Sequence, residues 1–255
     1  MSDEKISTIK NRFQTAPVEE LPSLMTLYRN DGRAGVVHLI ESASKKIAAY
    51  EKEVERVQAM LSYERQYASC GVICGIDEAG RGPLAGPVVA AAVILDMNCP
   101  ILYVNDSKQL SEKKREALYD EIMEKAVSVG VGIASPETID DINILQADYA
   151  AMREAVGKLT PQPEVLLNDA VTIPGLTARQ VPIIKGDAKS LSIAAASIIA
   201  KVTRDRMMRE YDVLFPEYGF AKNKGYGTAE HIAAIREYGP SPIHRRSFIS
   251  NFVSL

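Results

Sequence analysis

The sequence contains few of the residues that build cysteine-based or histidine-based sites. Its 255 residues include three cysteines, Cys70, Cys74 and Cys99, and three histidines. Three cysteines cannot all pair with one another, and their spacing matches neither a CxxC redox motif nor a four-ligand zinc site. We therefore expect reduced, packed thiols, and so few histidines leave little scope for acid–base chemistry.

Long apolar runs and an excess of positive charge are also absent. No uncharged run is long enough for a transmembrane helix, and the N-terminus, with Asp3, Glu4 and Lys5, is too charged to open a signal peptide. We therefore expect a cytoplasmic protein without membrane contact. The formal net charge of −3 lacks the basic excess that nucleic-acid-binding domains usually show, so any such function must be argued from a local site.

An ordinary globular composition, 46% hydrophobic and 25% charged, is divided into two zones that meet near Cys70. In the first zone apolar residues recur at every seventh position, which predicts one long amphipathic helix over about residues 31–67, with Asp31 as its N-cap. Pro17 and Pro22 are expected to break an earlier, shorter helical stretch. The residues that carry the repeat are Ile40, Ile47, Val54 and Leu61.

The charge of this first zone is balanced, because residues 1–67 contain five Lys and five Arg against two Asp and eight Glu. Balanced charge favours a helical hairpin that packs on itself or on the main domain over an arm that clamps nucleic acid. Coiled-coil dimerisation is a third alternative, supported by few heptads, and we expect a monomer. We place the domain boundary after residue 68, which gives an N-terminal helical extension, residues 1–68, and a larger domain, residues 69–255.

The second zone alternates short β-rich runs with helical patterns. The first two runs flank a Gly/Pro-rich stretch and are expected to be neighbouring strands, and the last helix is apolar enough at its start to lie deep in the core. This order predicts an α/β domain around a mixed sheet with flanking helices. The expected elements are strands over residues 72–76, 88–95, 165–167 and 181–184, an apolar stretch over 127–133, a helix capped by Ser111, and helices over 136–159 and 192–214.

Acidic residues follow three of the expected strands. Asp77 and Glu78 end the first, and Asp169 and Asp187 come just after two later ones. Carboxylates gathered at strand ends can share a cation, and their hard oxygen atoms suit Mg²⁺ or Mn²⁺, with no Cys/His cluster to compete. Two such ions, roughly 4 Å apart, would stabilise both the attacking water and the leaving oxygen in phosphodiester cleavage.

Each acid also has a simpler interpretation. A single Asp at a strand end is more often a turn residue or a helix cap, whereas several acids beside a glycine-rich loop favour the metal site. Adjacent residues of a regular strand point to opposite faces, so Asp77 and Glu78 both reach one site only if the strand ends or bulges there. Without metal, the clustered acids are expected to raise one another's pKa.

Gly80, Arg81 and Gly82, which we call the glycine loop, follow the first acids directly. Glycines there let a backbone approach a sugar or phosphate that a Cβ would exclude. The Walker pattern is absent, and Gly86 is displaced from the position that the dinucleotide fingerprint requires. The remaining alternatives are another kind of nucleotide loop and a plain tight turn.

These residues lie in blocks that resemble the signatures of type 2 ribonuclease H, which in bacteria is ribonuclease HII. The similarity runs in order from about residue 71 to residue 248, its first block is highly specific, and residues 1–68 lie outside the usual core. The blocks are Gly75-Ile-Asp-Glu-Ala-Gly-Arg-Gly-Pro-Leu-Ala-Gly-Pro87, Asn105-Asp-Ser-Lys-Gln-Leu110, residues 186–201 beginning Gly186-Asp-Ala-Lys-Ser190, Lys224-Gly-Tyr-Gly-Thr228 and His244-Arg-Arg-Ser-Phe248.

The resemblance implies a ribonuclease H-like catalytic domain over residues 69–255, with a C-terminal helical segment. It implies an endonuclease that hydrolyses the RNA strand of RNA/DNA hybrids and cuts on the 5′ side of ribonucleotides embedded in duplex DNA. The products are 5′-phosphate and 3′-hydroxyl ends, and the implied roles are removal of ribonucleotides and of RNA primers from DNA. The family's catalytic, metal-binding acids match Asp77, Glu78, Asp169 and Asp187, of which Asp169 stands in the least distinctive context.

The resemblance also implies substrate contacts. The glycine loop matches a segment whose backbone contacts the ribose 2′-hydroxyl, the group that distinguishes RNA from DNA. Tyr226 matches a tyrosine that stacks on the neighbouring deoxyribose at an RNA-to-DNA junction; a packing residue is the alternative. Lys108 and Lys189 are candidates for binding phosphates or for orienting the acids. Lys201 either joins them or lies with Arg204 on the solvated face of the core helix.

Rival interpretations remain at this stage. His244 and the two arginines after it either contact substrate or cap a C-terminal element. The acids alone would also fit another two-metal nuclease, a transposase or a resolvase. From a different class, a binding module would present metal-stabilised loops to nucleic acid without cutting it.

Overall fold

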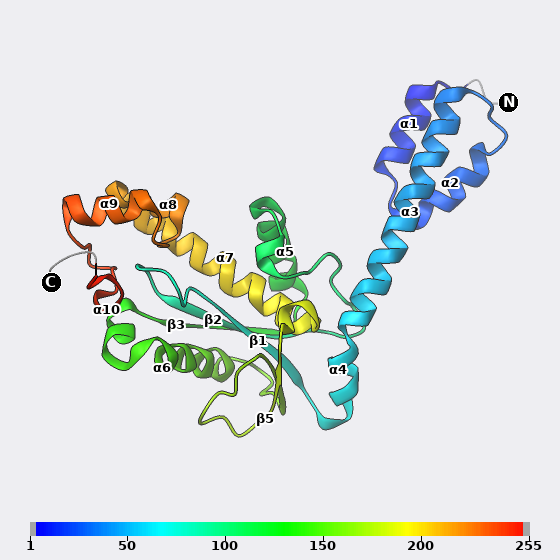
Figure 1. Cartoon of the computed structure of the whole chain (residues 1–255). Coiled ribbons are helices and arrows are strands. Elements are labelled where there is room, and N and C mark those ends of the chain that lie inside the picture. The colour runs from blue at the N-terminus through cyan, green and yellow to red at the C-terminus, as the bar shows by residue number, and fades with distance from the viewer. Residues whose placement is uncertain (1–3, 252–255) are drawn as a thin grey trace. The chain divides into compact units, whose positions relative to one another are not determined.

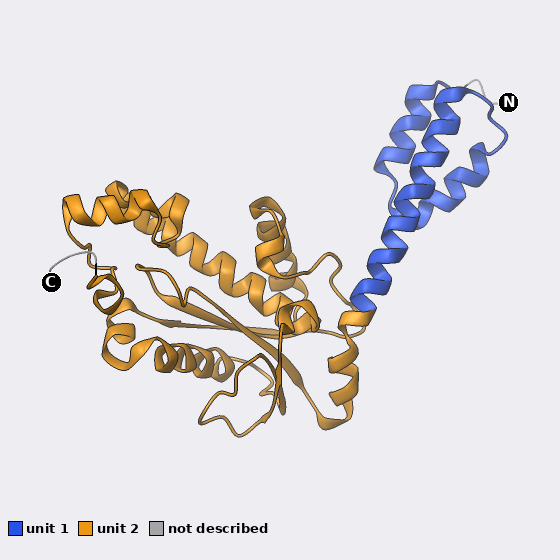
Figure 2. Ribbon diagram, viewed as in Figure 1, with its two compact units in different colours: residues 1–58 blue, residues 59–255 orange. Residues whose placement is uncertain are grey.

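The computed structural model describes residues 4–251, and the chain forms two compact units, residues 1–58 and residues 59–255 (Figure 2). The smaller unit contains α1 (Ile6–Thr15), the short 3₁₀ helix η1 (Val18–Glu20), α2 (Leu21–Tyr28) and most of α3 (Ala34–Met60). These helices pack on one another because they share a buried core, formed by Ile9, Phe13, Leu21, Tyr28, Val36 and Ala43.

Two details of the smaller unit differ from the predictions. Pro22 does not break a helix but lies in the first turn of α2, where its missing N–H removes no helical hydrogen bond. Asp31 does not cap α3, which begins at Ala34. Its carboxylate instead accepts hydrogen bonds from the backbone N–H and the guanidinium group of Arg33.

The helix predicted over residues 31–67 is interrupted at Leu61, after which the chain forms α4 (Ser62–Tyr67) and η2 (Ala68–Cys70). The buried Glu64 of α4 accepts hydrogen bonds from Ser190 Oγ at 2.7 Å and from the Ser192 N–H at 2.9 Å. Both donors lie at the N-terminus of a later helix, where unpaired N–H groups and the helix dipole favour a carboxylate. A heptad pattern carries no information about such a distant partner.

Five strands form one mixed sheet in the larger unit (Figure 1). β1 (Ile73–Ala79) pairs antiparallel with β2 (Val88–Ile94), which pairs antiparallel with β3 (Ser128–Ala134). On its other side β1 pairs parallel with β4 (Val165–Asp169), and β4 pairs parallel with β5 (Arg179–Ile183). The predicted mixed α/β sheet is therefore confirmed, and β1 and β2 are neighbours as expected.

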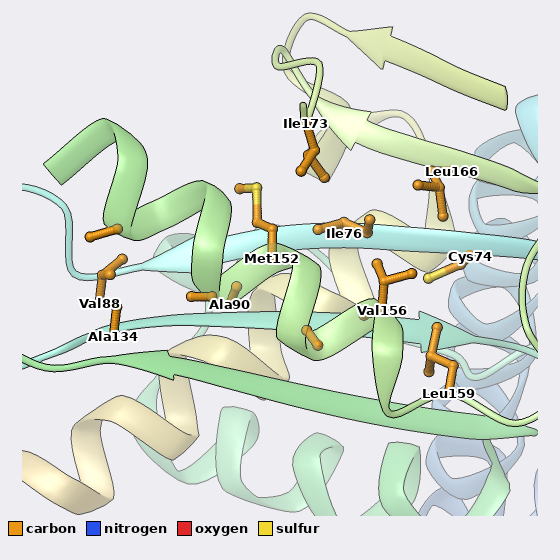
Figure 3. Close-up of a cluster of buried hydrophobic side chains, with 14 of the residues drawn as sticks. Cys74, Ile76, Val88, Ala90, Ala134, Met152, Val156, Leu159, Leu166 and Ile173 are labelled. Atoms are coloured by element: carbon orange, nitrogen blue, oxygen red, sulfur yellow. The ribbon is translucent and has the colours of Figure 1, made fainter. Parts of the chain in front are cut away.

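Helices cover both faces of this sheet. α6 (Pro136–Gly157) packs on one face, where its apolar side chains meet those of β1, β2 and β4 (Figure 3). α7 (Leu191–Leu214) packs on the other face, and α5 (Glu112–Lys125), capped by Ser111 as predicted, packs against α7. No helix within residues 4–251 has the length and apolar character that crossing a membrane requires. The remaining elements are η3 (Ser107–Gln109), η4 (Gly186–Ala188), η5 (Pro216–Tyr218), α8 (Phe220–Asn223), α9 (Ala229–Tyr238) and α10 (Arg246–Ile249).

β1 and α7 touch through their backbones at Gly75. A Cβ on Gly75 would lie 2.1 Å from the carbonyl carbon of Ser192, so only glycine permits this approach. The first ten residues of α7, from Leu191 to Ala200, are all buried, as their apolar run predicts. The contact at Gly75 thus sets the second half of β1 directly against α7.

The cysteines are free, but they do not share one environment. Cys74 lies in the core beneath α6, and burial raises the pKa of its thiol. Cys70 and Cys99 are exposed. The prediction of packed thiols is correct for Cys74 and wrong for the other two, because strand periodicity marks only Cys74 as an inward-facing residue.

Candidate active site

The carboxyl ends of β1 and β4 bring the first acids together. The two strands run parallel and pair Ile76 with Asn168, so the next residue of each, Asp77 and Asp169, comes at the same level of the sheet. Asp169 Oδ1 accepts a hydrogen bond from the Gly186 N–H at 2.7 Å, which holds the turn that carries the following residue, Asp187. Three acids from three separate segments therefore meet on the α7 side of the sheet.

Asp77 points towards α7, because it lies two residues after Gly75 on the same face of β1. It is 7% exposed, and the hydroxyl group of Ser197 in α7 lies close enough to act on its pKa, in the lowering direction. Ser197 Oγ in turn lies 2.8 Å from Ser107 Oγ in η3. Asp77 therefore lies beside a pair of hydroxyl groups, one of which belongs to the segment that carries Lys108.

Glu78 approaches the same cluster from the other face. Pairing with β2 continues through Ala79 without a bulge, so the strand does not end after Glu78 on that side as our prediction required. Pairing with β4 ends at Ile76, however, which leaves the β4-side edge of β1 open beyond that residue. Glu78 lies close enough to Asp169 and Lys108 for their charges to act on it.

Burial and neighbouring negative charge destabilise the charged forms of Asp77, Glu78 and Asp187. Burial, followed by the charges of Glu78 and Asp169, raises the pKa of Asp77 well above its usual value. Burial likewise raises the pKa of Glu78 and of Asp187, and the charge of Asp169 adds to both shifts. Lys108 faces the cluster, and although burial opposes it, the charge of Asp77 and its neighbours raises the pKa of that ammonium group.

A divalent cation would offset this repulsion, and the donor set suits one, since carboxylate oxygens are hard ligands. Within residues 4–251, no three Asp, Glu, His or Cys side chains are already arranged as ligands around one point. The acids form a concentrated negative cluster rather than a preformed coordination shell. A coordination shell would form only after side-chain rotations of Asp77, Glu78, Asp169 and Asp187.

A buried carboxylate that the sequence analysis missed lies beneath Glu78. Asp148 of α6 is fully buried, and its Oδ2 lies 3.5 Å from the Arg81 Nε. Burial, then the charge of Glu78, raises the pKa of Asp148 to about 7, while Arg81 opposes the shift. Arg81 also contacts Glu78, with 3.7 Å between its NH1 and Oε1. The arginine of the glycine loop therefore sits between two acids from different elements.

Two buried arginines hold the glycine loop from behind. Arg245 donates hydrogen bonds to the carbonyl oxygens of Gly80 at 2.6 Å, Arg81 at 3.0 Å and Gly86 at 2.9 Å. Gly80 has a φ of +98°, and a Cβ there would lie 2.1 Å from the Nε of Arg204. The loop requires glycine at this position both for its left-handed backbone and for the space that a guanidinium group fills.

The alternative that placed Arg204 on the solvated face of the core helix is wrong, because this side chain is 1% exposed. A signal was present in the sequence: Ala200 and Met208, four residues before and after it, are apolar, which marks one buried helical face. Lys201 is partly exposed and pairs with Asp205 at 2.8 Å. Arg245 is fully buried, so it supports the loop rather than meeting solvent.

The remaining predicted residues are near the surface. Tyr226 is 46% exposed, and a Cβ on Gly82 would lie 3.9 Å from Cε1 of its ring, so the tyrosine borders the glycine loop. Lys189 is exposed and directly follows η4, two residues after Asp187. The structure thus places Tyr226 beside the glycine loop and Lys108 beside the acids, and it leaves Lys189 exposed just after the turn that carries Asp187.

A chain of hydrogen bonds in the C-terminal helices ends on the backbone of Tyr226. His231 Nδ1 lies 2.9 Å from the Tyr226 carbonyl oxygen, and its Nε2 lies 2.9 Å from His244 Nε2. His244 Nδ1 accepts from the Ser241 N–H at 2.9 Å. Because a carbonyl only accepts and an amide N–H only donates, both rings must be neutral, with His244 donating to His231 and His231 donating to Tyr226.

Acidification is therefore expected to destabilise the protein through this pair. Burial, then the neighbouring His231, lowers the pKa of His244 to about 4. This folded-state pKa lies below the unfolded value of about 6.5. The free energy of unfolding therefore has its full value above about pH 6.5 and decreases as the pH falls towards 4. The decrease that His244 contributes is roughly 3 kcal/mol. Urea unfolding at several pH values measures the loss. His244→Gln should flatten the pH dependence in this window, and an unchanged dependence would contradict the assignment.

Comparison with known proteins gives one family for nearly the whole chain. A family model described as ribonuclease HII matches residues 74–251, and one described as ribonuclease HII N-terminal domain matches residues 5–68. The ribonuclease HII of Lachnoclostridium phytofermentans is 60% identical over 250 residues, 98% of this chain and 98% of that protein. The ribonuclease HII of Clostridioides difficile is 49% identical over 255 residues, 99% and 100% of the two chains.

Solved structures agree with this result. The ribonuclease H2 of Pyrococcus horikoshii aligns with a TM-score of 0.59 and 28% identity over 72% of this chain and 100% of that one. The ribonuclease HII of Archaeoglobus fulgidus, solved in complex with PCNA, aligns with a TM-score of 0.59 and 29% identity over 72% and 97%. Identity of this extent, on the fold described above, shows that the chain belongs to the ribonuclease HII family and is a ribonuclease H enzyme.

Proposed function

We propose that this enzyme cuts the RNA strand of RNA/DNA hybrids and also cuts on the 5′ side of single ribonucleotides embedded in duplex DNA. The observation that carries the proposal is the meeting of Asp77, Asp169 and Asp187 beside the glycine loop and the exposed Tyr226. The acids that meet at the strand ends would supply a cation site. The glycine loop and Tyr226 would contact the sugars on either side of one phosphate. Cleavage leaves a 5′-phosphate and a 3′-hydroxyl.

Asp77, Glu78, Asp169 and Asp187 would hold Mg²⁺ or Mn²⁺ in the working enzyme. Two such ions activate a water and stabilise the leaving oxygen of a phosphodiester. The chain's own contribution is to keep these acids together although the charges of Glu78 and Asp169 raise the pKa of Asp77, and the charge of Asp169 raises that of Asp187. Lys108, which faces the same acids, supplies a positive charge for a backbone phosphate.

Sugar recognition is assigned to the glycine loop and Tyr226. Arg245 fixes the peptide planes of Gly80 and Arg81 through their carbonyl groups, which gives the loop a defined backbone surface for a ribose 2′-hydroxyl. Tyr226 presents a partly exposed ring to stack on the next sugar, a deoxyribose at an RNA-to-DNA junction. Lys189, exposed beyond η4, is a second phosphate contact.

Cleavage of four 5′-labelled duplexes tests the proposal: all DNA, one ribonucleotide, four ribonucleotides, and a continuous RNA strand. A site that binds a hydroxyl group typically rejects a substrate lacking it by a factor on the order of 10⁴, so the all-DNA duplex should stay uncut while the other three are cut. EDTA should abolish cleavage, and Mg²⁺ or Mn²⁺ should restore it. If one ribonucleotide gives no higher rate than all-DNA duplex, the junction proposal is wrong.

The same proposal extends to the enzyme's place in the cell and to its domains. Removal of ribonucleotides and RNA primers from DNA, in repair and replication, is the role that such cleavage would serve in the cytoplasm. We also propose that the protein acts as a monomer, with residues 1–68 as the extension and residues 69–255 as the catalytic domain. Gel filtration coupled to light scattering tests the oligomeric state.

A further inference from the structure

Arg204 of α7 connects two segments that are far apart in the sequence. Its guanidinium group donates hydrogen bonds to the carbonyl oxygens of Ala85 at 3.0 Å and Pro87 at 2.9 Å, in the segment that continues from the glycine loop. A third hydrogen bond, at 2.9 Å, goes to the carbonyl oxygen of Lys224, two residues before Tyr226. One side chain therefore binds the segment just after the glycine loop and the segment just before Tyr226.

The two segments also touch each other directly. The Leu84 N–H donates to the Gly225 carbonyl oxygen at 2.8 Å. A Cβ on Gly225 would lie 2.4 Å from the Ala85 carbonyl oxygen, and one on Gly86 would lie 2.4 Å from the sulfur of Met208, one helical turn beyond Arg204. A Cβ on Gly225 would also lie 3.2 Å from Cε of Met208, so both segments rest on the same stretch of α7.

The chemistry of Arg204 suits a residue that fixes the relative positions of two segments better than one that only adds to overall stability. It is 1% exposed, and although burial lowers its pKa to about 10, the group is still charged at neutral pH. A buried charge is costly to desolvate and is tolerated when all its hydrogen bonds are made. The rigid, planar guanidinium group reaches three carbonyls at fixed angles, which a lysine ammonium group on its flexible stem cannot reproduce.

We propose that Arg204 is a positioning residue that sets the distance between the glycine loop and Tyr226, and so determines how strongly the enzyme prefers an RNA–DNA junction to a continuous hybrid. This inference rests on the proposed function, because it assigns the two segments to adjacent sugars of one strand. Two contacts one nucleotide apart act together only if their spacing matches the strand, and a misplacement of about 1 Å can cost on the order of 100-fold in rate.

Arg204→Lys tests the inference through a ratio: kcat/KM on a duplex with one ribonucleotide divided by kcat/KM on a continuous hybrid. We expect the ratio to fall about tenfold or more. Both values come from one preparation, so any inactive fraction cancels. Arg206→Lys is the matched control, since Arg206 lies on the same helix but bonds to Glu116 of α5 and should leave the ratio unchanged. An unchanged ratio in Arg204→Lys overturns the inference.

Tyr226→Ala separates failure of this inference from failure of the proposed function. If that variant keeps the wild-type ratio, junction recognition by Tyr226 is wrong, and the inference fails with it. If its ratio falls, the variant carrying both Arg204→Lys and Tyr226→Ala should fall no further, because Arg204 acts through Tyr226. Additive losses would overturn the inference. Should Arg204→Lys not fold, Gly225→Ala disturbs the same spacing at Ala85, and an unchanged ratio there overturns it equally.

Discussion

Asp77→Asn is expected to abolish cleavage while leaving substrate affinity near normal. The carboxylate of Asp77 lies at the centre of the acid cluster, within the electrostatic reach of Glu78 and Asp169. An amide of the same shape keeps the packing but is a poor cation ligand. We expect the rate to fall by about 1000-fold or more, equivalent to ~4 kcal/mol of transition-state stabilisation. Single-turnover cleavage and an equilibrium binding titration measure the two quantities separately.

The same substitution should make the metal-free protein more stable. An acid whose pKa is raised on folding destabilises the folded state at any pH above its unfolded pKa, so a neutral side chain removes that cost. Asp77 is 7% exposed and its pKa is raised by burial and by two neighbouring charges. We expect a gain of about 1 kcal/mol in the free energy of unfolding in EDTA, a common result when a strained functional group is neutralised.

Asp120→Asn provides the control, since Asp120 is largely exposed and only 3.7 Å from Arg206 in a surface ion pair. It should change neither activity nor stability measurably. A variant of Asp77 that cuts at the normal rate would remove this residue from the mechanism. A wild-type protein that binds hybrids but cuts none of them, with any metal, would favour the binding-module interpretation instead.

Gly75→Ala is expected to destabilise the larger unit by about 3 kcal/mol or more. The added Cβ would lie 2.1 Å from the carbonyl carbon of Ser192 and 2.3 Å from the nitrogen of Ile193. These are backbone atoms of a buried helix, so no side-chain rotation can relieve the overlap. β1 must move away from α7, which would also separate Asp77 from Ser197, and we expect the remaining folded protein to lose activity.

Gly157→Ala is the matched control for this substitution. Gly157 ends α6, and a Cβ there meets nothing within 4 Å. Alanine should stabilise the helix by up to about 1 kcal/mol, because it lowers the entropy of the unfolded chain. Urea unfolding midpoints compare the two variants. Equal midpoints for Gly75→Ala and Gly157→Ala would show that β1 and α7 are not in the tight contact described.

Much of the fold could be predicted because its elements carry local signals. Short apolar runs predicted β1, β2, β4 and β5, and an apolar start predicted the burial of α7. The acids were found because each follows a strand, and parallel strands bring their carboxyl ends to one edge. The break at Leu61 was not predicted, and the partners that Glu64 finds beyond it lie more than a hundred residues away, where no local pattern reaches.

The supports of the site were harder to predict than its acids. The hydrogen bonds described for Arg204 and Arg245 go to main-chain carbonyl groups, which every residue offers, so no motif marks these partners. Asp148 was missed for a similar reason, because a lone acid in a helix looks solvent-exposed until the fold places it under Arg81. Sequence patterns reveal groups that act chemically more readily than groups that hold those in place.

The hydrogen bonds of Glu64 constrain how the protein can be shortened. This carboxylate lies before residue 69, yet it receives the Ser190 hydroxyl and the Ser192 N–H at the start of α7, directly after the turn that holds Asp187. Deleting residues 1–68 would remove Glu64 and leave two buried hydrogen-bond donors without their acceptor. Deleting residues 1–58 would keep Glu64 and both hydrogen bonds. A loss of activity after deletion of residues 1–68 would therefore have two possible causes: the missing extension, or a disturbed start of α7 next to the turn that carries Asp187.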